Sequence, residues 1–236
     1  KKMFSYSFPL IIAGLAYATN EVLDKLLIAF FLGEESAGTY GAAYKLSIFM
    51  VLFVQAYRYA VEPYYFNNFK KTEFTQNYVK IMRYFVIISS LIFLIISLNI
   101  EYIMELLLLY SPYASEYKKG LEIIPIVLMA HLFLGIYYNL SMWYKLTNNT
   151  KYGAAISLTG ALITIVFNLI LIPKIGHIGS AWATLICYFS MALISYLFSR
   201  KYYYIPYEKI KITIYLISSV SIYVTASYLE IKGFIY

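Results

Sequence analysis

The chain has 236 residues, of which 61% are hydrophobic and only 13% are charged, and its mean hydropathy is +0.68. A soluble domain of this length needs more polar surface than this to cover its core, so the composition excludes an ordinary soluble protein and indicates a membrane protein. The net charge of +7 would also suit a nucleic-acid partner, but its distribution reports membrane topology instead, and we expect no such partner.

Apolar runs of about 20 residues, the length that crosses a hydrocarbon layer, recur along the whole chain. We predict seven transmembrane helices, at 9–32, 38–62, 79–98, 120–143, 152–172, 177–198 and 211–229. In lipid, every backbone amide must be satisfied within a helix or a closed barrel. The pattern of a barrel, segments of about ten residues with alternating polarity, is missing from the sequence. The predicted fold class is therefore an all-α membrane protein.

Lysine and arginine are concentrated on one side of the predicted spans. Twelve of the 19 lie on the side of the N-terminus: Lys1, Lys2, Lys70, Lys71, Lys80, Arg83, Lys145, Lys151, Arg200, Lys201, Lys209 and Lys211. Only four lie on the other side, and three lie inside spans. Since cytoplasmic loops carry the excess of basic residues, this bias places the N-terminus in the cytoplasm.

Two features concern the connections and the packing of the spans. The outward connection at 99–119 is rich in Leu and Ile, and it is either an extension of the third span or a short helix in the interface. The 28 tyrosines lie mainly near span ends, which favours an aromatic belt over sugar stacking. In the fifth span, small residues recur at helical spacing and predict close packing against another helix: Gly153, Ser157, Gly160, Ala161 and Thr164.

The first two spans carry charges at depths where charge is costly. Tyr17, Asn20, Glu21, Asp24 and Lys25 are spaced by three and four residues, so they share one face of a helix. At 1.5 Å per residue, Asp24 and Lys45 both lie on the order of 10–13 Å below the outer helix ends, so neighbouring helices can bring them to one depth.

Arg58 and Glu62 follow in the second span, one turn apart and near its cytoplasmic end. Lys45 and Arg58 are separated by about 220° on a straight helix, so either one of them faces a neighbouring helix or the helix bends.

Two interpretations of these charges are open. Paired charges can fix the register of the helices without any role in transport. Ionisable groups within a membrane also mark the routes of substrates and ions, and their concentration in two adjacent spans favours this second interpretation. We therefore predict that a substrate or ion cavity is lined by Glu21, Asp24, Lys25, Lys45, Arg58 and Glu62.

Signatures of catalysis are missing from the sequence. His131 and His177 are isolated, and no Cys, His and Asp cluster has the spacing of metal ligands. No Walker loop, dinucleotide glycine pattern or G-x-S-x-G elbow is present, and Cys187, the only cysteine, cannot form an internal disulfide. We expect no enzyme, with no catalytic residue, no cofactor and no metal site.

Three segments together resemble one family of transporters. They are FPLIIAGLAYATNEVLDKLLIAFFLGEESAGTYGAAYKL (8–46), LTNNTKYGAAIS (146–157) and NLILIPKIGHIGSAWATL (168–185). They resemble the C-terminal half of bacterial polysaccharide, or O-antigen, flippases, which belong to the multidrug/oligosaccharidyl-lipid/polysaccharide exporter superfamily. The pattern from Asn168 to Thr184 is the most specific part of the resemblance.

The resemblance implies a fold of two six-helix lobes around a central cavity. Residues 1–200 would form the C-terminal lobe and 201–236 an additional, truncated transmembrane helix. Because the chain starts with Lys1 rather than Met and has an odd number of predicted spans, we expect a fragment whose N-terminal lobe is a missing partner. Such a fragment alone would flip no substrate.

The resemblance also implies a function and a place in the cell. The family moves undecaprenyl diphosphate-linked oligosaccharide across the bacterial cytoplasmic (inner) membrane, for the O-antigen and lipopolysaccharide of the cell envelope. We expect a multi-pass protein that contacts membrane lipids and works by alternating access. Lys25 and Lys45 would attract the diphosphate, while Asp24 or Glu21 would neutralise them or carry a coupling ion.

Three alternatives stay open. A drug or cation exporter of the same superfamily would confer resistance to cationic dyes without altering glycans. A membrane polysaccharide polymerase or ligase would carry a long, Arg-rich outward loop, whereas the connection at 99–119 is short and acidic. A structural scaffold without transport activity would tolerate neutralisation of all the charges within spans.

Overall fold

The computed structural model describes residues 2–110 and 120–229. Within these two ranges the chain forms ten helices and no strand. The helices are α1 (Lys2–Leu32), α2 (Glu34–Leu46), α3 (Ile48–Asn68), α4 (Phe74–Leu98), α5 (Ile100–Tyr110), α6 (Ile124–Leu140), α7 (Met142–Leu146), α8 (Lys151–Ile175), α9 (His177–Tyr202) and α10 (Lys209–Tyr228). The predicted fold class, an all-α membrane protein, is confirmed.

Most of the predicted spans correspond to helices that are long and apolar enough to cross a membrane. Five such helices occur in the described part of the chain: Phe74–Leu98, Gly120–Leu146, Lys151–Ile175, His177–Tyr202 and Lys209–Tyr228. The pair formed by α2 and α3 makes a sixth if it is counted as one bent span. The remaining predicted span, 9–32, lies within α1, which has 31 residues, carries Glu21, Asp24 and Lys25, and is not among these five helices.

The second predicted span is not one straight helix. It divides at Ser47 into α2 and α3, whose axes differ by 53°. The buried Ser47 donates a hydrogen bond of 2.6 Å from its hydroxyl to the backbone oxygen of Tyr44, which is a local alternative to the regular helical pattern. The sequence left two possibilities for Lys45 and Arg58: one of them faces a neighbouring helix, or the helix bends between them. The structure shows the bend.

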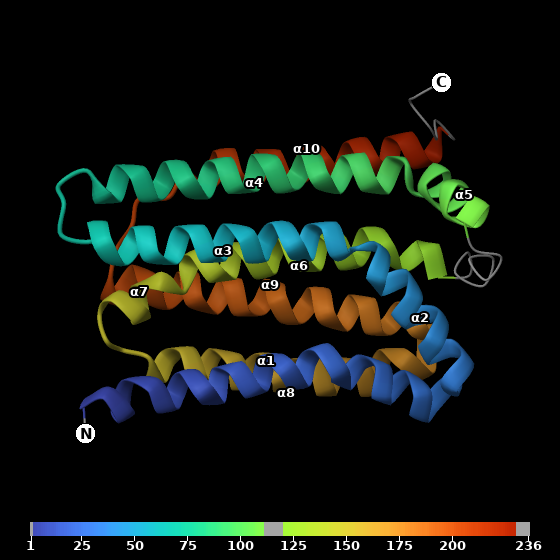
Figure 1. The fold of residues 1–236 in the computed structure, drawn as a ribbon, viewed down its shortest axis with the longest axis horizontal. Coiled ribbons are helices and arrows are strands. Elements are labelled where there is room, and N and C mark those ends of the chain that lie inside the picture. The colour runs from blue at the N-terminus through green and yellow to red at the C-terminus, as the bar shows by residue number, and fades with distance from the viewer. Residues whose placement is uncertain (1, 111–119, 230–236) are drawn as a thin grey trace.

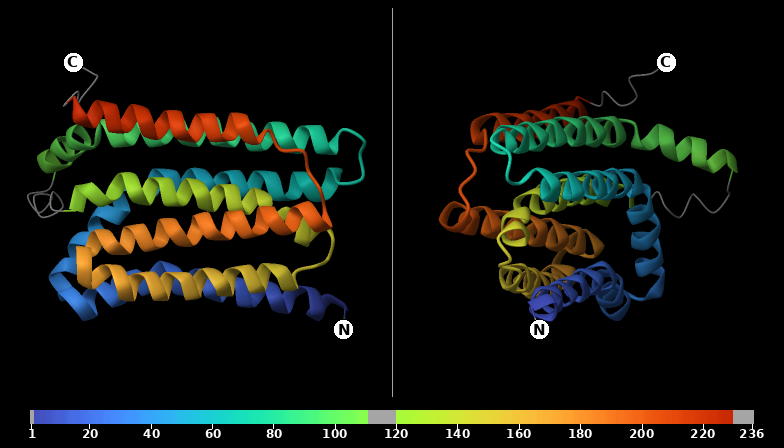
Figure 2. Two further views of the ribbon diagram at one scale, coloured as in Figure 1. Left: turned by 180° about the vertical axis from the view of Figure 1, so that it is seen from behind. Right: turned by 60° about the vertical axis from the view of Figure 1, so that its left-hand side comes forward.

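The long helices pack as a bundle with a definite order of neighbours (Figure 1). α1 packs along α8, α8 along α9, and α9 along α6. On the other side, α4 contacts α6 and α3, and α10 packs along α4. α2 crosses one end of the bundle between α1 and α3, and within the described residues α1 and α3 make no contact with each other (Figures 1 and 2).

The connections divide the bundle into two ends. The N-terminus lies at the same end as the α3–α4 connection, the α7–α8 connection and the link from α9 to α10 (Figure 1). We call this the N-terminal end; the basic clusters at 70–71, 200–201 and 209–211 lie in or beside these connections. At the opposite end, α5 is a helix separate from α4, and the rest of the connection, 111–119, lies outside the described residues.

The small-residue face of α8 is confirmed as a packing surface. A Cβ atom on Gly160 would lie 2.5 Å from the sulfur of Met191 on α9, and one on Gly153 would lie 2.6 Å from the ring of Tyr144. Ser157 and Thr164 on the same face are buried, whereas Ala161 is half-buried. Gly176 alone joins α8 to α9, with a φ of 67° that glycine adopts without strain, so the two helices form a tight hairpin.

Candidate functional site

Asp24 on α1 is the centre of a buried polar cluster. Its side chain is only 3% exposed, and three other elements bring donors to its two oxygens. Tyr40 on α2 donates to Oδ2 over 3.3 Å, Thr184 on α9 donates to the same oxygen over 2.6 Å, and Asn168 on α8 donates to Oδ1 over 3.1 Å. Asp24 therefore joins α1 to a broken span and to the α8–α9 hairpin.

Further oxygen atoms surround these partners one helical turn away. Asn20, Thr164 and Ser180 each lie four residues before Asp24, Asn168 and Thr184, respectively, and so share their helix faces. The side-chain oxygens of these three residues and Oδ1 of Asn168 are buried and have no hydrogen-bond partner among the described residues. We call the whole set the Asp24 cluster: Asn20, Asp24, Tyr40, Thr164, Asn168, Ser180 and Thr184.

The chemistry of the Asp24 cluster suits a small, hard cation. Carboxylate, amide and hydroxyl oxygens are the ligands that such cations prefer. A buried polar atom without a partner is costly, and a cation or proton bound beside Asp24 would satisfy the oxygen atoms listed above. Within the described residues no three His, Cys, Asp or Glu side chains gather, so a transition-metal centre of that kind is not formed there.

Lys25, the neighbour of Asp24, points to a different group. Its Nζ lies 5.3 Å from the centre of the Tyr44 ring, a cation–π distance. The hydroxyl of Tyr44 lies 3.2 Å from Nε2 of His131, and Nδ1 of His131 lies 2.9 Å from the backbone oxygen of Val127. His131 is fully buried and lies between these two polar partners, which the sequence did not predict.

Lys45, also predicted in this region, does not join the Asp24 cluster in the structure. Lys45 lies exposed in the last turn of α2, and within the described residues no ion pair links it to Asp24. The 53° bend after Leu46 and the use of Tyr40 instead explain how α2 reaches Asp24 without Lys45. Glu21 lies on α1, one turn before Lys25, but its side chain and that of Tyr17 are outside the described ones.

Arg58 and Glu62 lie at a second place, in the C-terminal half of α3, which points toward the N-terminal end of the bundle. Arg58 Nε is 3.1 Å from Oε1 of Glu62, as their spacing of one turn predicts. Nζ of Lys145 on α7 lies 2.5 Å from the same oxygen. These three side chains face a cleft of about 260 Å³ between α1 and α3, which is also lined by Tyr6, Gly14 and Tyr138.

The cleft combines net positive charge with aromatic surface. Among the described side chains that line it, two are cationic, Arg58 and Lys145, and one, Glu62, is anionic. The guanidinium of Arg58 stacks on the ring of Tyr138, at 4.7 Å from its centre. Such a surface suits an anionic ligand that also carries sugar or other stacking groups.

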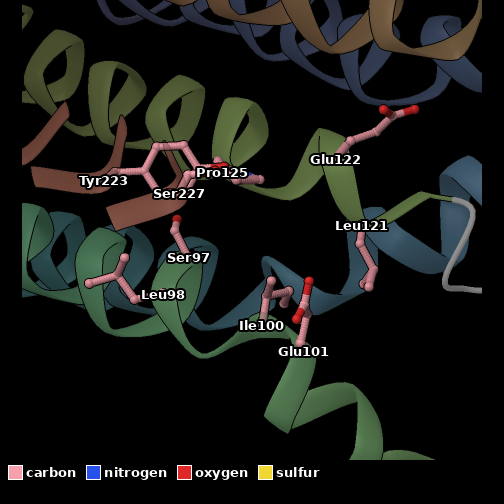
Figure 3. Close-up of a pocket in the computed structure, with 9 residues that line it drawn as sticks. All are labelled: Ser97, Leu98, Ile100, Glu101, Leu121, Glu122, Pro125, Tyr223 and Ser227. Carbon is pink, nitrogen blue, oxygen red and sulfur yellow. The ribbon is translucent and has the colours of Figure 1, made fainter. Parts of the chain in front are cut away.

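A further cavity lies at the opposite end of the bundle (Figure 3). It has about 220 Å³ and is bordered by Ser97 on α4, Glu101 on α5, Pro125 on α6 and Tyr223 on α10. Glu101 and Glu122 both border it, but their side chains point in different directions, and Glu122 lies 3.5 Å from His177. The two carboxylates do not form a paired site, and we assign this cavity no role.

Sequence reasoning missed most partners of the charged residues. Asn168 and Thr184 belong to the family pattern, and as polar residues within spans they carry a signal that a buried charge needs partners. Tyr40 carries no such signal, because tyrosines near span ends are common. Lys145 lies among the loop charges of the sequence, and nothing there places it beside Glu62.

Comparison with known proteins gives the family. A family profile described as MatE matches residues 9–170, more than half of the chain. No match was found among curated proteins or among solved structures. The matched range covers most of α1, all of α2 to α7 and most of α8, and it includes Asp24, Tyr40, Asn168, Arg58, Glu62 and Lys145. The chain therefore belongs to the MatE family, whose members are membrane exporters of the multidrug/oligosaccharidyl-lipid/polysaccharide exporter superfamily.

Proposed function

We propose that this chain is one lobe of a cation-coupled exporter that flips undecaprenyl diphosphate-linked oligosaccharide across the bacterial cytoplasmic membrane. The cleft supports the choice of this substrate. Among its described lining residues are two cations, Arg58 and Lys145, one anion, Glu62, and several tyrosines. A cleft with excess positive charge favours an anionic diphosphate over the cationic dyes that a drug exporter of the same superfamily would carry.

The Asp24 cluster supplies the coupling in this proposal. Asp24 draws α1, α2, α8 and α9 together through its hydrogen bonds, so a cation bound there would change how these helices pack. Alternating access requires one lobe to rock against another around a central site. The N-terminal lobe is the expected partner, and the basic connections at the N-terminal end of this chain support a cytoplasmic location for that end.

Two variants of the full-length protein test the proposal in a bacterium whose own copy has been deleted. Asp24→Asn should abolish surface polysaccharide and cause lipid-linked oligosaccharide to accumulate inside the cell, because the neutral amide removes the charge that binds the cation. The matched control is Glu34→Gln, an exposed carboxylate at the start of α2, which should leave the glycan unchanged. Both proteins are quantified in the membrane fraction.

The deletion strain alone separates the proposed cargo from the alternatives. Loss of surface polysaccharide with unchanged resistance to cationic dyes would support a flippase. Sensitivity to dyes with an intact glycan would instead identify a drug exporter. Short, unpolymerised glycan chains at the surface would point to a polymerase, and no change in either property would leave a scaffold.

A further inference from the structure

Glu62 holds both cations of the cleft through one atom. Its Oε1 accepts hydrogen bonds from Nε of Arg58, at 3.1 Å, and from Nζ of Lys145, at 2.5 Å. Among the side chains that the structure describes at the cleft, Glu62 is the only carboxylate. One carboxylate oxygen therefore neutralises part of two positive charges, and the group as a whole keeps a net charge of +1.

Arg58 is arranged to bind a second anion. The ion pair with Glu62 uses only Nε of the Arg58 guanidinium. Within the described residues, the two terminal nitrogens of this guanidinium form no other ion pair. Stacking on Tyr138 fixes the plane of the guanidinium in the cleft. A planar fork of N–H donors matches the oxygens of a phosphate, and Lys145 adds a point charge beside it.

The bond from Lys145 to Glu62 also links two helices. Glu62 lies on α3, whereas Lys145 lies on α7, which is separated from α6 by the break at Ser141. The side chain of Lys145 is only 11% exposed and that of Glu62 is 25% exposed, so the lysine is the more enclosed partner. If another anion replaced Glu62 as the partner of Lys145, the partly exposed carboxylate of Glu62 could be hydrated by solvent. α7 would then lose this connection to α3.

Resting on the proposed function, we propose that the cleft is the entry site for the diphosphate of the lipid-linked substrate, and that the diphosphate displaces Glu62 from Arg58 and Lys145. Glu62 thus competes with the substrate for the two cations and holds α7 against α3 until the substrate arrives. The volume of about 260 Å³ lies near the lower limit of ligand pockets, about 300–1,000 Å³, which suits a headgroup rather than a whole oligosaccharide.

Binding to the purified full-length protein in nanodiscs tests the exchange, with undecaprenyl diphosphate as the probe. Glu62→Gln removes the competing charge and should tighten binding by about threefold to tenfold, because the two cations lose an ion-pair partner. Lys145→Gln should weaken binding by a similar factor. The matched control is Glu208→Gln, since Glu208 also bridges two cations, Arg83 and Lys211, at the same end but outside the cleft.

Each result has a distinct meaning. If Glu62→Gln weakens binding or leaves it unchanged while the wild type binds the probe, the exchange is refuted and the proposed function stands. If no variant binds the probe and deletion of the gene leaves the glycan intact, the proposed function itself falls. If nanodiscs of phosphatidylglycerol, or inorganic pyrophosphate alone, compete as well as the probe, the cleft takes phosphate of another source and the assignment to the lipid-linked substrate is overturned.

The variants are also compared by thermal unfolding, so that a loss of binding is not mistaken for misfolding. Lys145→Gln leaves the pair of Arg58 and Glu62 intact, and it keeps the test valid if Glu62→Gln does not fold. In that case, weakening by Lys145→Gln with no weakening by Glu208→Gln supports the cleft as the site. Equal weakening in both would refute it.

Discussion

The hydroxyl of Thr184 on α9 lies 2.6 Å from the carboxylate of Asp24 on α1, the shortest of the three hydrogen bonds that Asp24 accepts from Tyr40, Asn168 and Thr184. Hydrogen bonds to an ionised group are about twice as strong as those between neutral groups, so Thr184 contributes to the orientation of this carboxylate. It also links the first half of α9, close to the turn of the α8–α9 hairpin, to α1, which borders the cleft.

Thr184→Val removes that hydroxyl while keeping the shape of the side chain. If the Asp24 cluster binds a cation, the concentration of Na⁺ that gives half of the thermal stabilisation of the full-length protein should rise about tenfold. Titrations with Na⁺, Li⁺ and K⁺, followed by thermal unfolding, measure this shift and identify the ion. Thr184→Ser keeps the hydroxyl and should behave like the wild type; a valine variant with an unchanged Na⁺ dependence would refute the role of this oxygen.

Lys25 and Lys45 test the cationic cavity predicted from the sequence. Lys25→Ala and Lys45→Ala in the full-length protein should each abolish surface polysaccharide if both lysines attract the diphosphate. The structure places Lys25 over Tyr44 and leaves Lys45 exposed, so the two variants examine separate places. Wild-type glycan in both strains, with normal amounts of protein in the membrane, would show that the cations that matter lie elsewhere.

Gly179→Ala tests the close contact within the α8–α9 hairpin. A Cβ atom at Gly179 would lie 2.6 Å from the backbone carbon and oxygen of Leu171, which cannot move aside as a flexible side chain can. Overpacking of this kind costs about 1–3 kcal/mol, so the melting temperature should fall. Gly38→Ala is the control: no atom lies within 4 Å of its added Cβ, and alanine favours the helix, so its melting temperature should stay the same or rise.

Glu208 predicts a dependence of stability on pH at the N-terminal end. The hydrogen bond from Lys211 first, and the one from Arg83 in addition, lower the pKa of Glu208 from its usual 4.5. A lowered folded-state pKa means that this carboxylate stabilises the fold above its unfolded pKa, and that the stabilisation is lost as the pH falls through the folded pKa. The link between α4 and the start of α10 should therefore loosen in acid.

Limited proteolysis of the 203–208 link between pH 3 and pH 7 measures this loosening. The wild type should be cleaved faster as the pH falls through the range below about 4.5. Glu208→Gln should show fast cleavage with little pH dependence, because the amide never carries the charge. Parallel pH profiles for the two proteins would contradict the prediction.

The helices could be predicted because apolar runs of this length are dictated by the thickness of a bilayer. The break at Ser47 could not, since it depends on one hydroxyl and on the need of α2 to cross the end of the bundle. Similarly, helical spacing predicted the pair of Arg58 and Glu62, but Lys145 joins them through tertiary packing. The partners of Asp24 come from three helices, and no local rule relates them to it.

The separation of those partners along the chain has a consequence for biosynthesis. Asp24 is followed by Asn168 only after 144 residues and by Thr184 only after 160. At about 5–20 residues per second, a ribosome needs roughly 7–32 s to make that stretch. During this time α1 must wait in or beside the membrane without the hydrogen bonds from Asn168 and Thr184. Gly176 joins α8 and α9 so closely that one hairpin brings both partners to Asp24.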